Sequence, residues 1–124
     1  MKKPLLFRGC ATALITPFEK DAPDKIDTAA LAHLIRRQTD ADVDAIVTAG
    51  TTGEASALTA KEHRLLITEA KKHAPDTPVI AGCGAPTTAG VLTLARDAAD
   101  AGADAILVVT PYYNKCSQEG LYRH

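Results

Sequence analysis

The chain has 124 residues, of which 46% are hydrophobic and 23% charged, and its formal net charge is −1. This is the size and composition of one globular domain, and a charge near zero without a basic cluster argues against nucleic acid as a partner. No apolar run approaches the roughly 18 residues of a membrane span, and Leu5-Leu6-Phe7 is too short for a signal-peptide core. Three widely spaced cysteines form no CxxC pair or disulfide framework. We therefore expect reduced thiols, a cytoplasmic location and one domain over residues 1–124.

The first half of the chain predicts two buried strands with one helix between them. Mostly apolar runs, ended by Thr16-Pro17 and by Gly50, are typical of strands, and apolar residues at helical spacing after a capping aspartate are typical of a helix. A polar stretch that contains a proline indicates a loop between the first strand and this helix. In chain order we expect a strand at Cys10–Ile15, a loop at Glu19–Lys25, a helix from Asp27 to about Asp40 and a strand at Val43–Ala49.

The second half repeats this alternation. Thr59-Ala60-Lys61-Glu62 is a capping box, which opens a helix that carries Leu65, Leu66 and Ala70 and ends before Pro75. A strand is predicted at Pro78–Ala81, followed by a helix that Thr87 or Thr88 caps and Gly102 ends. The apolar face of this helix consists of Val91, Leu94, Ala95, Ala98 and Ala99. The last predicted elements are a strand at Ala105–Val109, a loop at Pro111–Cys116 and the first turn of a helix capped by Ser117.

Strands recur about every thirty residues with one helix between each pair, which is the length of a βαβ unit. Residues 43–47 also resemble residues 103–107, sixty positions later. Runs of such units indicate a parallel sheet covered by helices. Two closures fit: an open doubly wound sheet, or a (β/α)8 barrel of about 250 residues, of which four units make half. In both folds, ligands bind at the C-terminal ends of the strands.

Hydroxyl and amide side chains gather at these predicted strand ends. In Gly50-Thr51-Thr52-Gly53-Glu54, two hydroxyls lie between glycines near a helix start, where backbone N–H groups suit a carboxylate. Thr16 and Tyr112-Tyr113-Asn114 follow the first and fourth strands. Threonine and tyrosine hydroxyls can relay a proton but are too weakly basic to abstract one unaided. The pattern predicts a small-anion site, although a plain strand-to-helix turn and tyrosines that only pack are alternatives, and Glu54 is either a catalytic acid or a solvent-facing residue.

Other catalytic patterns are missing from the sequence. The four histidines have no metal-ligand spacing, no G-x-S-x-G elbow occurs, and no GxGxxG follows the first strand. A Schiff-base lysine needs a lowered pKa, usually from an apolar pocket. All eight lysines lie in polar or helix-surface contexts, and Lys115, the nearest to a strand end, adjoins Asn114.

Three stretches resemble one family closely. Residues 50–55 with 58–63 are similar to the second-strand loop of the dihydrodipicolinate synthase family, residues 111–122 to its fourth-strand loop, and residues 13–18 to its opening strand. The resemblance covers nearly the whole chain. It implies a (β/α)8 TIM barrel, of which this chain holds the first four βα units, without metal or cofactor.

The resemblance also implies a reaction and roles for individual residues. Pyruvate forms a Schiff base with a lysine and condenses with aspartate semialdehyde in lysine (diaminopimelate) biosynthesis. By analogy Thr52, with Thr51 and Gly53, binds the pyruvate carboxylate, while Thr51 and Tyr113 belong to a proton relay that Tyr113 enters across a dimer interface. Thr16, Tyr112 and Asn114 are candidate supporting residues. Alternatives are a related pyruvate-dependent aldolase, of the N-acetylneuraminate lyase or 2-keto-3-deoxy sugar acid type, and an inactive half-barrel that acts as an assembly module.

Three departures from the family pattern matter. Cys116 replaces the usual proline, and residues 84–90 lack the Asn and Glu that bind feedback lysine, so we expect weak lysine inhibition. The sequence stops before the fifth strand, with its relay tyrosine, and the sixth, with the Schiff-base lysine. It is therefore expected to be either a fragment of a longer enzyme or a truncated relative whose unpaired strand edge must be covered by self-association.

Overall fold

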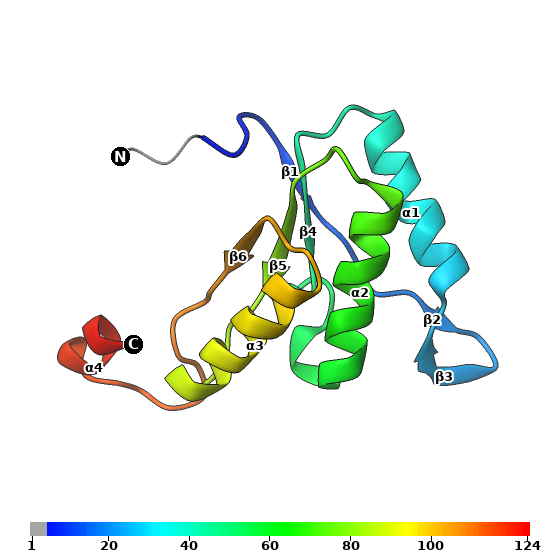
Figure 1. The fold of residues 1–124 in the computed structure, drawn as a ribbon. Coiled ribbons are helices and arrows are strands. Elements are labelled where there is room, and N and C mark those ends of the chain that lie inside the picture. The colour runs from blue at the N-terminus through cyan, green and yellow to red at the C-terminus, as the bar shows by residue number, and fades with distance from the viewer. Residues whose placement is uncertain (1–4) are drawn as a thin grey trace.

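The computed structural model describes residues 5–124, which form a four-stranded parallel sheet, a two-stranded hairpin and the helices that Figure 1 labels. The strands are β1 (Ala11–Ala13), β2 (Phe18–Glu19), β3 (Ala22–Ile26), β4 (Ala45–Thr48), β5 (Val79–Gly82) and β6 (Ala105–Leu107). The helices are α1 (Thr28–Asp40), the 3-10 helix η1 (Ala55–Ala57), α2 (Ala60–His73), α3 (Thr88–Asp100) and α4 (Gln118–Arg123). The four predicted strands and the predicted helices are confirmed, with small differences at their ends.

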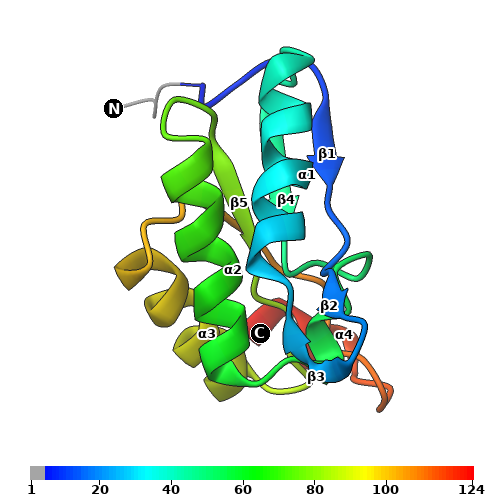
Figure 2. The same ribbon diagram turned by 90° about the vertical axis from the view of Figure 1, so that its right-hand side faces the viewer.

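The order of the strands distinguishes the two predicted closures. The sheet runs β1-β4-β5-β6 in chain order, and each pairing is parallel. A doubly wound sheet instead reverses its order at a switch point and carries helices on both faces. Here α1, α2 and α3 lie along the same side of the sheet (Figures 1 and 2). This is the arrangement of a (β/α)8 barrel, in which the helices form an outer ring.

The core lies between the sheet and these helices. Its larger cluster joins α1, α2, β4 and β5 through Leu31, Ile35, Leu66, Ile46 and Val79. A smaller cluster joins α2, β5 and α3 through Ile67, Ala81, Cys83 and Ala98. All of these side chains are almost completely buried. Burial of each large aliphatic side chain contributes about 1.5–3 kcal/mol, so this layer holds the sheet and the helices together.

Local side chains fix where the helices begin. Asp27 accepts a hydrogen bond from Ala30 N at 2.9 Å, as predicted. In the predicted capping box, Thr59 N donates to the Glu62 carboxylate at 2.7 Å and Glu62 N donates to the Thr59 hydroxyl at 3.3 Å. The hydrogen bonds that the Glu62 carboxylate receives from the Thr59 side chain and backbone lower its pKa. The third cap is Thr87, one of the two threonines predicted, and Ser117 caps α4.

The predicted loop at Glu19–Lys25 is wrong. This stretch lies in an antiparallel hairpin, in which β2 pairs with β3 and Phe18 stands opposite Ile26. Both residues pack on the larger core cluster, and Asp27 N donates to Pro17 O at 2.9 Å at the base of the hairpin. Burial at its two ends therefore orders a stretch whose sequence is polar, because strand preference depends more on context than on intrinsic propensity.

The predicted apolar face of α3 is wrong at one position. Ala98 is buried, whereas Ala99 is exposed. Successive helical residues point about 100° apart, so only one of two neighbouring alanines can face the sheet.

Candidate functional site at the rim of the sheet

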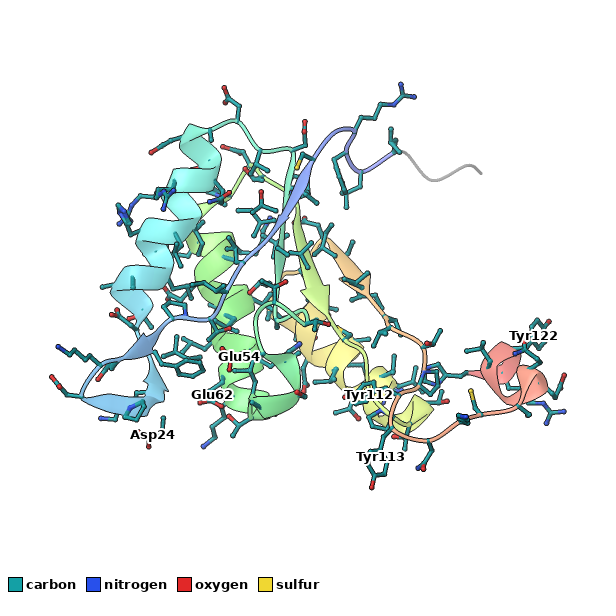
Figure 3. The ribbon with its side chains drawn as sticks, turned by 180° about the vertical axis from the view of Figure 1, so that it is seen from behind. Asp24, Glu54, Glu62, Tyr112, Tyr113 and Tyr122 are labelled. Carbon is teal, nitrogen blue, oxygen red and sulfur yellow. The ribbon has the colours of Figure 1, made fainter. Side chains whose placement is uncertain are left out.

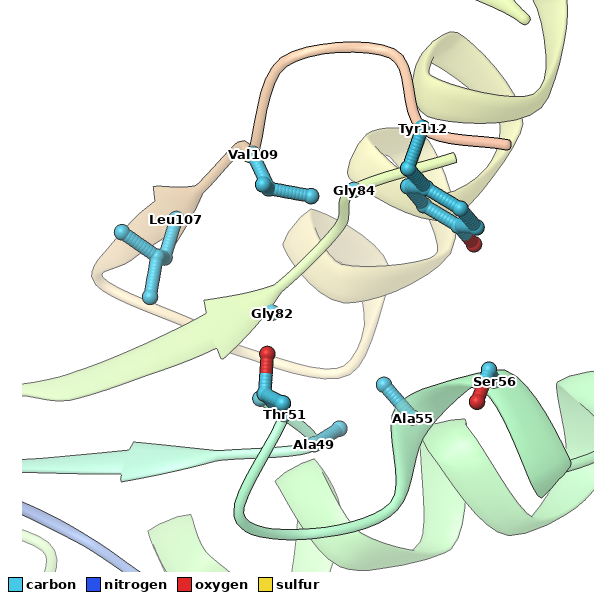
Figure 4. Close-up of a pocket in the computed structure, with 10 residues that line it drawn as sticks. Ala49, Thr51, Ala55, Ser56, Gly82, Gly84, Leu107, Val109 and Tyr112 are labelled. Atoms are coloured by element: carbon cyan, nitrogen blue, oxygen red, sulfur yellow. The ribbon is translucent and has the colours of Figure 1, made fainter. Parts of the chain in front are cut away.

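A cavity of about 270 Å³ lies where the strands β4, β5 and β6 end. Its walls come from the three loops that follow these strands (Figure 4). The lining residues are Ala49, Gly50, Thr51, Ala55, Ser56, Gly82, Gly84, Leu107, Val109 and Tyr112. Parallel strands present their C-terminal ends at one rim, which is why residues that are about sixty positions apart in sequence meet here. The rim at which the sequence predicts a site therefore contains a cavity.

The loop after β4 turns sharply at the cavity wall. Gly53 N and Ala55 N both donate to Gly50 O, at 3.0 and 3.2 Å, and Glu54 N donates to Thr51 O at 3.0 Å. Ala49 and Glu54 have left-handed backbones, with φ of 51° and 59°. Such conformations are uncommon outside glycine and mark a loop shape that the surrounding structure imposes.

This turn gives the two threonines different positions. Thr51 lines the cavity, and Figure 4 shows its side chain pointing from the loop toward the end of β5. Both threonines are exposed, but Thr52 is not among the lining residues. Within residues 5–124, the backbone N–H groups of Thr51 and Thr52 donate to no protein acceptor. Adjacent N–H groups that are free in a turn have the chemistry that suits an anion.

Thr16 supports this loop from the neighbouring strand. Its hydroxyl donates to Gly53 O at 2.7 Å, and both residues are buried. A Cβ on Gly53 would lie 3.1 Å from Leu14 O and 3.3 Å from Ala49 N, so glycine allows the loop to pack tightly on the strand ends. Gly53 therefore shapes the loop from beneath and does not itself line the cavity.

His63 is a buried residue of the site region that the sequence did not reveal. It lies on α2 with 3% exposure, and its Nε2 is 2.7 Å from Gly82 O. Because a carbonyl only accepts, Nε2 carries the proton. Gly82 lines the cavity, so this hydrogen bond ties α2 to the cavity wall. The only sequence feature that points to His63 is its position on α2, four residues after Thr59 and on the same helix face as Leu66 and Ile67. That position by itself indicates only that His63 is buried.

The segment after β5 is buried and tightly packed. Cys83 lies behind the cavity wall, with its side chain in the smaller core cluster. Burial raises the pKa of its thiol to about 11. A protonated, buried thiol is a poor nucleophile, so Cys83 acts here as a small apolar side chain.

The aromatic loop after β6 places its two tyrosines in different environments. Tyr112 lines the cavity, and Figure 4 shows its ring across the cavity from Thr51. Tyr113 is 94% exposed, and Figure 3 shows it pointing away from the body of the chain. Its φ of 76° is in the left-handed region, which is unfavourable for an aromatic residue. Asn114 is also exposed and does not line the cavity.

The chemistry of the cavity is that of hydroxyls, free N–H groups and apolar walls. None of its lining residues is a lysine, and residues 5–124 contain no cluster of three His, Cys, Asp or Glu side chains that could hold a metal. Glu54 is exposed, as expected for a solvent-facing residue.

In the described part of the chain, no helix is both long and apolar enough to cross a membrane.

The fold and this rim define part of a (β/α)8 barrel with a cavity at the C-terminal ends of its strands. The chain belongs to the dihydrodipicolinate synthetase family, whose model matches residues 6–124. It is 49% identical to the 4-hydroxy-tetrahydrodipicolinate synthase of Nitratiruptor over 119 residues, which are 94% of this chain and 40% of that protein. It is 45% identical to the Kosmotoga olearia synthase over 120 residues, which are 96% of this chain and 40% of that protein.

Solved structures agree with this assignment. The dihydrodipicolinate synthase of Thermotoga maritima superposes with a TM-score of 0.90 at 38% identity, covering 96% of this chain and 40% of that one. The synthase of Acinetobacter baumannii complexed with pyruvate gives a TM-score of 0.88 at 44% identity, covering 93% of this chain and 39% of that one. These neighbours are TIM barrels, which confirms the predicted fold class. The chain spans about 40% of the length of these relatives.

Proposed function

We propose that this chain supplies the pyruvate-binding part of a 4-hydroxy-tetrahydrodipicolinate synthase. In the proposed reaction, a lysine from a later part of the barrel forms a Schiff base with pyruvate, which condenses with L-aspartate 4-semialdehyde in lysine biosynthesis. The observation that carries the proposal is the Thr51 loop: the Thr51 side chain lines the cavity, and the N–H groups of Thr51 and the neighbouring Thr52 have no protein acceptor within residues 5–124. Family membership and the pyruvate complex of the Acinetobacter relative support it.

The proposed roles follow from what each group can do. The N–H groups of Thr51 and Thr52 and the Thr52 hydroxyl bind the pyruvate carboxylate, because donors in a turn match a planar anion. The Thr51 hydroxyl accepts and donates a proton during formation of the Schiff base and removal of a C3 proton. Gly53 and Thr16 hold the loop in place. Tyr112 closes the cavity from the β6 side, and Asn114 remains a candidate supporting residue for the aromatic loop.

In this proposal, Tyr113 acts in the site of a second subunit. Its side chain is 94% exposed in a strained backbone conformation. A bulky residue is held at positive φ only where the surrounding structure requires it. In a homodimer or homotetramer, the ring would cross the interface and complete the partner's relay with its phenol.

The test is a chimera, because the chain spans about 40% of its relatives. Residues 1–124 are joined to the remaining part of the Nitratiruptor synthase, and synthase activity is measured with pyruvate and aspartate semialdehyde. Thr51→Val should lower kcat by about 10²-fold or more, as loss of a proton-transfer group does. Thr68→Val is the matched control, since Thr68 is exposed on α2 and bonds only to Arg64 O. An inactive chimera that folds, or equal rates for the two variants, would contradict the proposal.

Two alternatives have distinct outcomes. If the chimera cleaves N-acetylneuraminate or a 2-keto-3-deoxy sugar acid faster than it condenses aspartate semialdehyde, the chain belongs to another pyruvate-dependent aldolase. The second alternative, an inactive half-barrel, is tested on the 124-residue chain alone. Borohydride reduction with labelled pyruvate should leave it unlabelled, because no lysine of the described chain lines the cavity. That result would fit an inactive half-barrel that acts as an assembly module.

We also propose weak feedback by lysine. Residues 84–90 carry no Asn or Glu side chain that could bind the amino groups of lysine. Half-inhibition of the chimera by sub-millimolar lysine would refute this proposal.

A further inference from the structure

The carbonyl of Gly82, at the end of β5, receives its hydrogen bond from a side chain where a sheet would supply a backbone N–H. In the pairing of β4 with β5, Ile46 N donates to Pro78 O at 2.9 Å. Hydrogen bonds are evenly spaced along a parallel pair of strands, and alternate residues face the same neighbour. Four residues further along both strands, the ladder donor for Gly82 O is therefore Gly50 N.

Gly50 N does not make this bond. Within residues 5–124 it donates to no protein acceptor. Ala49, with its φ of 51°, turns the chain out of the strand direction just before it. The turned peptide nevertheless stays against the end of β5 (Figure 4), because a Cβ on Gly82 would lie 2.6 Å from Ala49 C and 2.8 Å from Gly50 Cα. A backbone donor that fits the ladder thus lies beside the Gly82 carbonyl without binding it.

His63 takes the place of that donor. Its Nε2 donates to Gly82 O at 2.7 Å, and its side chain is almost completely buried. In the described part of the chain its other ring nitrogen, Nδ1, is buried without a partner, so the ring has its one protein hydrogen bond at Gly82 O. The first turn of α2 fixes the ring, because His63 N donates to Thr59 O at 2.9 Å and Thr59 belongs to the capping box. His63 therefore ends the ladder between β4 and β5 from outside the sheet.

The end of this ladder decides where the Thr51 loop begins. With Gly82 O occupied, the chain can leave β4 at Ala49, and Thr51 reaches the cavity wall just after this turn. Without the imidazole, this buried carbonyl needs another donor. A bond from Gly50 N would supply one, would extend the ladder and would return Ala49 to an extended backbone, which relieves its strain. The same change would move Thr51 from its present position.

We propose that His63 is a positioning residue of the proposed synthase. By holding Gly82 O it keeps Gly50 out of the ladder, and so it sets the position of the Thr51 hydroxyl and of the free N–H groups beside it. The imidazole does not line the cavity, so it acts only through the loop. The inference rests on the proposed function for its effect on rate, and on the hydrogen bonds around Gly82 for its effect on structure.

The kinetic test uses the chimera with the Nitratiruptor synthase. His63→Leu removes the donor, whereas His63→Gln keeps an amide N–H near the position of Nε2. A displacement of about 1 Å in a reacting group can cost about 10²-fold in rate. We therefore expect His63→Leu to lower kcat/KM for pyruvate by about tenfold or more, and His63→Gln to recover it to within about threefold. Thr68→Val is the matched control, because it removes a hydrogen bond to Arg64 O on the exposed face of the same helix and should keep the wild-type value.

A second readout separates positioning from a general loss of stability. Exchange of the Gly50 amide hydrogen is followed by NMR in chimeras with isotope-labelled glycine, and its signal is assigned by its absence in Gly50→Ala. In the wild type this N–H is free, so it exchanges quickly. In His63→Leu it should exchange about tenfold more slowly, because the new bond to Gly82 O protects it. A variant that is only less stable opens more often and exchanges faster, which is the opposite change.

Slower exchange at Gly50 in His63→Leu, together with recovery of the rate in His63→Gln, supports the proposal. Unchanged or faster exchange at Gly50, the wild-type kcat/KM in a folded His63→Leu chimera, or an equal loss in His63→Gln overturns it. If His63→Leu does not fold, His63→Asn replaces it, because its amide is polar but too short to reach Gly82 O. A wild-type chimera without synthase activity would refute the proposed function, and exchange at Gly50 would still decide the role of His63.

Discussion

Gly82 is the position where the structure makes the sharpest prediction about stability. It ends β5 and lines the cavity. A Cβ on Gly82 would lie 2.0 Å from Ala49 O and 2.8 Å from Gly50 Cα. These atoms belong to the backbone at the end of β4, so no side-chain rotation can relieve the contact. The Gly82→Ala substitution must push the ends of β4 and β5 apart and also move the carbonyl that His63 binds.

The expected magnitude follows from this geometry. Forcing one extra carbon into a packed region costs about 1–3 kcal/mol, and a contact with backbone belongs at the upper end. Replacing glycine by alanine also lowers the conformational entropy of the unfolded chain, which offsets about 0.4–1 kcal/mol of this destabilisation. We therefore expect Gly82→Ala to lower the free energy of unfolding by about 2 kcal/mol. For 124 residues the unfolding entropy is about 0.26 kcal/mol/K, which gives a fall in Tm of about 8 °C.

Gly50→Ala is the matched control on the facing loop. Its Cβ would lie 3.5 Å from Val47 Cγ1, an ordinary contact, and Gly50 does not have a positive φ. The variant shares the unfolded-state effect but not the strain, so its Tm should equal or exceed that of the wild type. Thermal and urea unfolding, followed by circular dichroism, measure both variants. If Gly82→Ala melts within about 2 °C of Gly50→Ala, the strand ends are not packed as described.

Three further predictions concern single groups. Burial would raise the pKa of Asp104, but hydrogen bonds from Val79 N and Lys71 lower it overall. Its carboxylate therefore stabilises the fold above the unfolded pKa. The advantage of wild type over Asp104→Asn, about 1 kcal/mol at neutral pH, should disappear when urea unfolding is repeated at pH values that fall from the unfolded pKa through the lowered folded pKa. Thr16→Val leaves the buried Gly53 carbonyl without its donor and should destabilise the chain by about 1–3 kcal/mol in the same assay, a loss that Thr16→Ser should largely avoid. Because burial raises the thiol pKa of Cys83 to about 11, a thiol reagent at pH 8 should modify the two exposed cysteines quickly and Cys83 only after denaturation; rapid reaction of all three would contradict its burial.

The candidate site was predictable where it depends on strand ends. The order of strands and helices places Thr51 and the aromatic loop at one rim, whatever the details of packing. The difference between Tyr112 and Tyr113 was not predictable, because it depends on the φ of 76° that the loop imposes at Tyr113. His63 was also hidden. Its role depends on a contact with Gly82, nineteen residues away, which no local pattern encodes.

The sequence by itself determined the features that act within one turn or one strand. Asp27 and Thr59 cap the helices that follow them, because a cap and its N–H groups are only three residues apart. The tertiary structure alone decided the pairings between distant segments, such as the hydrogen bond from Cys10 N to the carboxylate of Asp44, thirty-four residues away, and the hairpin anchored by Phe18. Such contacts form only when the core brings their partners together, so their geometry is a property of the whole fold.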